Sequence, residues 1–299
     1  MSILETDLLL KDTFSITEKL TQNLMNDYVE AHNWLESIGI NVSPSRFNHY
    51  RKNIEKSVHP KSVEEAFRYL WMSAELHDIC EVHKYLSQVS SQALIQKLRL
   101  AVKGPLRLDD ESVNAGANKG RNYTFELYCA SRLARAGLSV RLDSISDIEF
   151  SLGDTRCHVE CKRVYDEKRL YDLVIEAINQ IDKRCITDSS DRGIVALSVS
   201  RMVHKAIGMS ANGVYADLYE MQSVMRELVG KWGIMFKKIF SNKSDKTVGI
   251  LLHYKMPFID RGTGATAFLN RFGLTSFDSG PDNLVFARRV SGLLGNSVE

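Results

Sequence analysis

The spacing of apolar residues predicts helices in the first third of the chain. In residues 63–88, apolar side chains recur at intervals of three and four, and neither Gly nor Pro interrupts them. A second helix is expected over residues 90–102. We therefore expect residues 1–105 to form an all-helical N-terminal domain, which would serve substrate recognition, binding of a partner protein or dimerisation.

Residues 103–122 break this pattern with four residues typical of turns, Gly104, Pro105, Gly116 and Gly120. A cluster of three acidic residues lies within the same stretch, at 109–111. We place a domain boundary here and expect a second domain over residues 115–299.

In this second domain, helix patterns alternate with strand patterns. Residues 193–200 and 247–254 are nearly continuous apolar runs, which are typical of strands buried on both faces. The predicted order is helix 123–137, strands 138–142, 147–152 and 155–162, helix 169–186, strand 193–200, helix 214–240 and strand 247–254. This order predicts an α/β fold with a mixed sheet flanked by helices, whose later strands are joined by helical crossovers.

A hairpin in this domain brings acidic residues together. The Gly-Asp pair at 153–154 suits a two-residue turn with Gly at its first central position. If it is the turn, Leu152 pairs with Thr155, and Asp147 then lies directly opposite Glu160. The Cβ atoms of these two acids would be about 5 Å apart.

The two-residue period of a strand places Glu160 and Lys162 on the same face of the hairpin as Asp147 and Glu149. The other face is apolar and carries Ile148, Phe150, Cys157, Val159 and Cys161. The carboxylates and the lysine should therefore cluster on one side.

Like charges directly opposite each other destabilise a sheet unless something compensates them. A divalent cation would do so, because Mg²⁺ and Mn²⁺ prefer hard oxygen ligands. A lysine beside the metal could orient or help deprotonate an attacking water. The hairpin thus predicts a metal-dependent hydrolytic site; the alternative is a solvated strand face on which Lys162 only screens two acids.

Residues 120–200 resemble the PD-(D/E)xK nuclease superfamily, which has the restriction-endonuclease-like fold. The resemblance depends on Glu126 in the helix, then Asp147, then Glu160 and Lys162 in an E-x-K motif, followed by a helix and a buried strand. It implies a nuclease that requires Mg²⁺, for which Mn²⁺ would substitute.

The same resemblance assigns roles to individual residues. Asp147 and Glu160 would hold the metal ion together with the backbone carbonyl of Cys161. Lys162 would position the attacking water, and Glu126 would bind the metal indirectly or support a second ion.

Many members of the superfamily carry a polar residue on the following helix, and Gln180 occupies that position. This chain departs from the pattern at two places. Arg184 replaces a tyrosine that one branch has four residues after the glutamine, and Ser146 precedes Asp147 where the motif has proline. Glu149 and His158 share the acidic face, where they would have a supporting or structural role or, for His158, contact the substrate.

The resemblance implies an endonuclease that hydrolyses DNA in restriction, phage defence, recombination or repair. Two alternatives stay open: an RNA nuclease, and a catalytically silent module that binds nucleic acid or acts as a scaffold. Cutting both strands of a duplex needs two sites, so a homodimer with an isologous interface is also expected.

The amino-acid composition says less about function than the hairpin does. The 299 residues carry a net charge of only +2, but residues 231–299 contain ten Lys or Arg against five Asp or Glu. Such a surplus can serve phosphate contacts, although it also occurs on surfaces without that role.

The five cysteines are scattered along the chain, which indicates reduced thiols and not disulfide bonds. With no membrane-spanning run and no basic start that would suggest a signal peptide, we expect a cytoplasmic protein.

Overall fold

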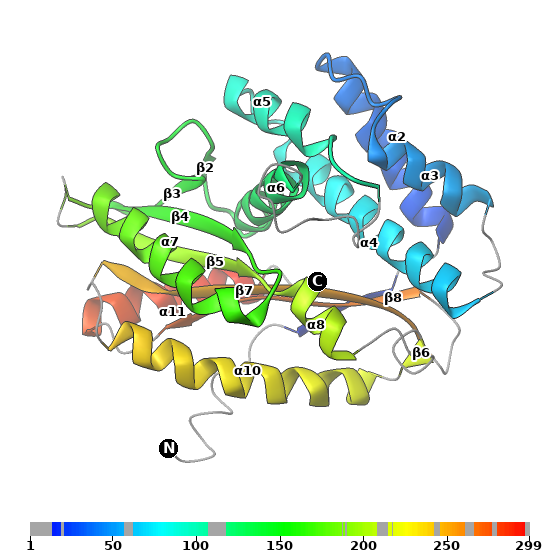
Figure 1. Cartoon of the computed structure of the whole chain (residues 1–299). Coiled ribbons are helices and arrows are strands. Elements are labelled where there is room, and N and C mark those ends of the chain that lie inside the picture. The colour runs from blue at the N-terminus through cyan, green and yellow to red at the C-terminus, as the bar shows by residue number, and fades with distance from the viewer. Residues whose placement is uncertain are drawn as a thin grey trace.

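Figure 1 shows a computed structural model in which helices cover both faces of one mixed sheet. The predicted α/β class is therefore confirmed. The structure describes residues 14–18, 21–56, 62–106, 118–186, 188, 190–207, 215–216, 218–241, 246–260, 266–276 and 280–296.

The described strands form a single eight-stranded sheet. Seven of them follow the order β1-β8-β7-β5-β4-β3-β2, and β6 pairs with β7. Neighbours among β4, β5 and β7 are parallel, whereas β2, β3, β8 and β1 join the sheet in antiparallel pairs. The bounds are β1 Phe14–Glu18, β2 Val140–Arg141, β3 Ile148–Leu152, β4 Thr155–Arg163, β5 Arg192–Ser198, β6 Tyr215–Ala216, β7 Thr247–Asp260 and β8 Thr266–Ser276.

Two groups of helices bury the two faces of the sheet. One face packs against α4, α6 and α11, with α2 and α3 packed on α4 and α5 packed on α6. The opposite face packs against α7, α8 and α10. The bounds are α2 Thr21–Ser37, α3 Arg46–Lys56, α4 Val63–Leu86, α5 Gln92–Ala101, α6 Lys119–Arg135, α7 Leu170–Arg184, α8 Ser200–Ile207, α10 Leu218–Phe240 and α11 Pro281–Asn296. The short 3₁₀ helix η1, Glu167–Arg169, precedes α7.

The N-terminal third differs from the prediction at residues 14–18, which form strand β1 instead of a helix and pair with β8. Phe and Ile alternate there with Ser and Thr, a pattern typical of strands, but five residues are too few for the spacing alone to decide.

The predicted boundary between the two domains lies mostly at 107–117, outside the described residues. One apolar cluster joins α2–α6 to the sheet and α11. The division into two domains stays a prediction.

The predicted hairpin register is confirmed. Leu152 pairs with Thr155, and Ile148 pairs with Val159. Gly153 has a φ of 62°, the left-handed conformation that this turn needs at its first central position. On the apolar face of the hairpin, Cys161 is partly buried, and the other four residues are buried as expected.

A buried ion network joins three helices on the α4 side of the sheet. Glu75 of α4 accepts from Arg46 of α3 at 3.0 Å and from Arg121 of α6 at 2.9 Å. Burial raises the pKa of the Glu75 carboxyl, but Arg121 and Arg46 outweigh this effect and hold the pKa below its usual value. Glu75 is therefore ionised and is shared by two arginines.

The substitution Glu75→Gln should lower the free energy of unfolding by about 3–5 kcal/mol, because it leaves two buried guanidinium groups without their counter-charge. Urea denaturation checks this. Glu64→Gln is the matched control: Glu64 lies on the same helix and pairs with Arg68 at the surface, so its loss should cost below about 0.5 kcal/mol. Equal effects of the two substitutions would contradict the role given to the network.

The same variant should respond differently to acid. Because the pKa of Glu75 is lower in the folded state than in the unfolded chain, its contribution to stability is present above the unfolded pKa and is lost as the pH falls through the folded pKa. Unfolding curves measured from neutral to acidic pH should therefore fall less steeply for Glu75→Gln than for the wild type. A parallel pH dependence would exclude this contribution.

Candidate active site

The hairpin brings Asp147 and Glu160 together at the end opposite its turn. The backbone N–H of Asp147 donates to Glu160 Oε1 at 3.4 Å, and Asp147 Oδ2 accepts from the backbone N–H of Cys161 at 2.8 Å. The first contact follows from the register, because Asp147 comes one residue before the pair formed by Ile148. Two of the three predicted metal ligands, Asp147 and Glu160, are thus brought together, each carboxylate accepting from the backbone of the facing strand segment.

Glu160 lies in a buried environment and not on a solvated strand face. It is 2% exposed, since α7 packs over this side of the hairpin. The guanidinium of Arg184, from the last turn of α7, forms an ion pair with the Glu160 carboxylate. Burial lowers the pKa of Arg184, whereas the charge of Asp147 raises it. The alternative of a solvated face screened only by Lys162 is therefore wrong.

Lys162 shares this face with Glu160, as predicted, and donates from Nζ to Glu176 of α7 at 2.7 Å. Gln180 lies one helical turn from Glu176 and one turn from Arg184, so the three side chains form one stripe along α7. Gln180 Oε1 is buried and has no hydrogen-bond partner among the described residues. Glu176 and Arg184, at the two ends of this stripe, contact Lys162 and Glu160 of β4, so the stripe faces that strand.

Glu126 approaches from the other side of the sheet, on α6. Its Oε2 accepts from Nζ of Lys97, which belongs to α5. Burial raises the pKa of the Glu126 carboxyl to about 7; the charge of Asp147 adds to this effect, and those of Lys97 and Lys162 oppose it. Glu126 is therefore within electrostatic range of Asp147 and Lys162. Lys97 was not predicted, because its contact with Glu126 spans two helices.

The carboxylates at this site are the kind of ligand that Mg²⁺ prefers. Asp147 and Glu160 offer two carboxylates, and Mg²⁺ usually takes one or two carboxylates and completes its shell with water and substrate phosphate. In the described parts of the chain, no three His, Cys, Asp or Glu side chains are grouped so that they could form a metal cage.

Glu149 and His158 belong to a neighbouring buried cluster. His158 Nδ1 lies 3.7 Å from Glu149 Oε2, and its Nε2 lies 3.5 Å from Asp191 Oδ2. Asp191 also binds Arg156, through a 2.6 Å contact. These contacts support the structural role for Glu149 and His158.

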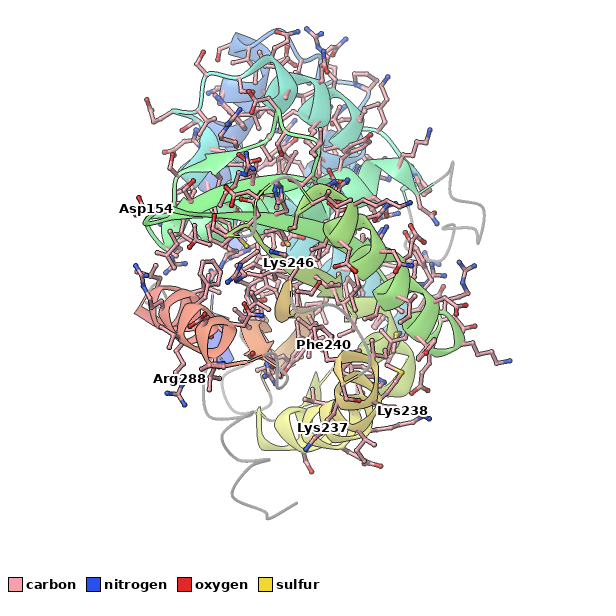
Figure 2. All side chains as sticks on the ribbon, turned by 90° about the vertical axis from the view of Figure 1, so that its left-hand side faces the viewer. Asp154, Lys237, Lys238, Phe240, Lys246 and Arg288 are labelled. Carbon is pink, nitrogen blue, oxygen red and sulfur yellow. The ribbon has the colours of Figure 1, made fainter. Side chains whose placement is uncertain are left out.

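Several of the basic residues in 231–299 lie away from this site. Figure 2 shows Lys237, Lys238, Lys246 and Arg288 on the side of the molecule that carries the hairpin turn, marked by Asp154. Asp147 and Glu160 lie at the other end of the hairpin. Among the described residues, the cations that contact the candidate site include Lys97 of α5, Lys162 of β4 and Arg184 of α7.

No protein-family model, curated protein or solved structure matches the chain. The described helices include none with the length and apolar character that a membrane span requires. The functional assignment therefore depends on the geometry of the site.

The pair of Arg184 and Glu160 predicts how metal ions affect stability. Arg184→Gln should lower the free energy of unfolding by about 3 kcal/mol in EDTA, because it leaves a buried carboxylate without its counter-charge. Mn²⁺ should restore much of this loss and raise the Tm of the variant more than that of the wild type. Lys183→Gln, at an exposed neighbouring position on α7, is the control for thermal unfolding. An equal Mn²⁺ shift in all three proteins would contradict a metal site at Glu160.

Proposed function

We propose that the protein is a metal-dependent nuclease that hydrolyses phosphodiester bonds, with DNA as the favoured substrate. In this proposal, α6, β2–β5 and α7 form a restriction-endonuclease-like core, and the helices before residue 105 form a domain that contacts DNA or a partner. The observation that carries the proposal is the hairpin register, which sets Asp147 against Glu160 and leaves Lys162 on the same face.

The chemistry is divided among these residues. Asp147 and Glu160, with the Cys161 carbonyl, would hold Mg²⁺ or Mn²⁺. The bound ion supplies positive charge to the scissile phosphate and lowers the pKa of water. Lys162 orients the attacking water, and for this its ammonium group must leave Glu176.

Neighbouring side chains tune this arrangement. Glu126 supports the ion through water or helps to hold a second ion, and Lys97 fixes the orientation of its carboxylate. Gln180 has a buried amide oxygen without a partner among the described residues, on the helical stripe that faces β4, and this oxygen would accept a hydrogen bond from water. Arg184 provides the counter-charge of Glu160 in the absence of metal.

Cleavage assays test the proposal. Purified protein is incubated with plasmid, linear duplex, single-stranded DNA and RNA, in Mg²⁺, Mn²⁺ or EDTA. We expect metal-dependent cleavage of DNA, reduced about a hundredfold or more by Glu160→Ala and by Lys162→Ala, because each removes a group that acts on the reacting atoms. The control Lys168→Ala changes an exposed lysine of η1 and should retain cleavage.

Three results would contradict the proposal: cleavage in EDTA, full activity of Lys162→Ala, or no cleavage of any substrate. Cleavage of RNA alone would reassign the substrate and keep the chemistry. Circular dichroism of each variant separates loss of activity from loss of folding.

A further inference from the structure

Lys97 brings a positive charge from α5 to the acidic end of the hairpin. Its Nζ donates to Oε2 of Glu126 on α6 and lies 5.4 Å from the centre of the Tyr123 ring. Glu126 and Tyr123 are three residues apart, so both contacts come from one face of α6. On either side of Lys97, Leu94 and Leu98 are buried and fix α5. The ammonium group is therefore held in place by two packed helices.

The pair of Lys97 and Glu126 is shielded from water. The two side chains are only 15% and 11% exposed. Burial lowers the pKa of the Lys97 ammonium, but the charges of Glu126 and Asp147 outweigh this effect and raise the pKa, so the group stays charged. Lys97 thus lies in the field of a second carboxylate, Asp147, which is one of the proposed metal ligands.

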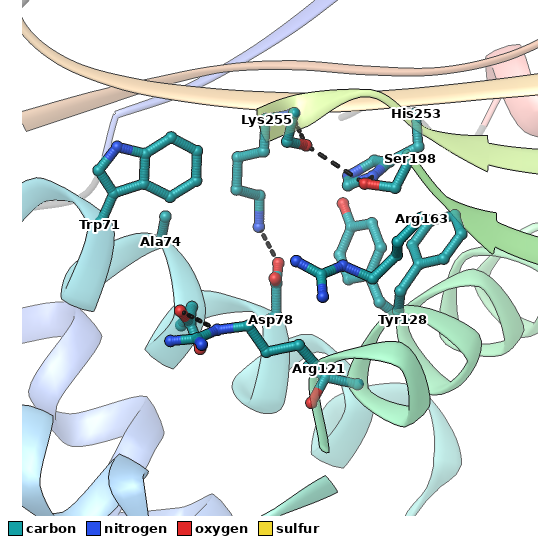
Figure 3. Close-up of a pocket in the computed structure, with 13 residues that line it drawn as sticks. Trp71, Ala74, Asp78, Arg121, Tyr128, Arg163, Ser198, His253 and Lys255 are labelled. Atoms are coloured by element: carbon teal, nitrogen blue, oxygen red, sulfur yellow. Dashed lines mark hydrogen bonds and ion pairs between the residues drawn. The ribbon is translucent and has the colours of Figure 1, made fainter. Parts of the chain in front are cut away.

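Figure 3 shows another buried lysine, which has no such position. Lys255 of β7 forms an ion pair with Asp78 of α4, at a cavity between the sheet and the helices α4 and α6. The other carboxylate that lines this cavity, Glu75, is shared by Arg46 and Arg121. Such pairs give buried carboxylates the counter-charge that they need. The pair formed by α5 differs because its carboxylate belongs to the candidate active site.

We propose that Lys97 occupies the position of a second metal ion beside Glu126, so that the acidic cluster takes a single divalent cation, at Asp147 and Glu160. An ion bound directly by Glu126 would lie next to the Lys97 ammonium, and like charges repel strongly where little water screens them. This inference rests on the proposed function. It leaves Glu126 the role of supporting the single ion through water, and Lys97 supplies the positive charge that a second ion would bring to the substrate phosphate.

Titration with Mn²⁺, followed by electron paramagnetic resonance, tests this inference by counting the bound ions without any need for activity. At saturating Mn²⁺, Lys97→Gln should bind one ion more than the wild type, because Glu126 then lacks its counter-charge. Addition of Glu126→Gln to this variant should remove the extra ion and so assign it to Glu126. Lys97→Arg keeps the positive charge and should bind as many ions as the wild type.

Two further variants complete the test. Arg99→Gln changes an exposed residue of the same helix and should leave the ion count unchanged. Glu126→Gln alone should also leave it unchanged, and this comparison does not require Lys97→Gln to fold. Circular dichroism verifies the folding of each variant.

The inference is overturned if Glu126→Gln lowers the ion count of the wild type, or if folded Lys97→Gln binds no more ions than Arg99→Gln. A different result would refute the proposed function itself. If Glu160→Gln retains every ion that the wild type binds, the proposed metal site is absent, and the inference fails with it.

Discussion

Acidic side chains gathered at one end of a buried hairpin need positive charge beside them, and much of this structure provides it. Glu160 is almost fully buried, and α7 places Arg184 against it. Glu126 approaches from the opposite layer, and α5 supplies Lys97. Because an uncompensated buried carboxylate is costly, these cations stabilise the site in the absence of a metal ion. In the proposed function, a divalent cation would meet the same requirement.

The sheet explains why two charged regions lie close together without merging. Strand β4 ends with Lys162 on the α7 face and Arg163 at the cavity beneath α4 and α6. Glu160 and Lys162 therefore lie on the opposite side of β4 from Arg163. The two-residue period of the strand separates these environments over a single residue step.

Features with local causes could be predicted from the sequence. The Gly-Asp turn predicted the hairpin register, and the alternation of apolar runs predicted the order from α6 to β5 and the later α10 and β7. It did not predict α8 or β6. Features that depend on distant parts of the chain could not. Strand β1 forms because β8 offers a partner, and the acidic face is buried because the crossover helix α7 returns over it. The contacts of Lys97 with Glu126 and of Arg184 with Glu160 depend on these tertiary arrangements, which no local spacing encodes.

The most direct test of the central claim is anomalous diffraction from crystals of the protein soaked in Mn²⁺. Our account predicts one strong anomalous peak bound by the carboxylates of both Asp147 and Glu160, with the Arg184 guanidinium displaced from Glu160. A well-ordered structure at saturating Mn²⁺ without a peak between these carboxylates would contradict the account, as would a peak there that Glu160→Ala leaves unchanged.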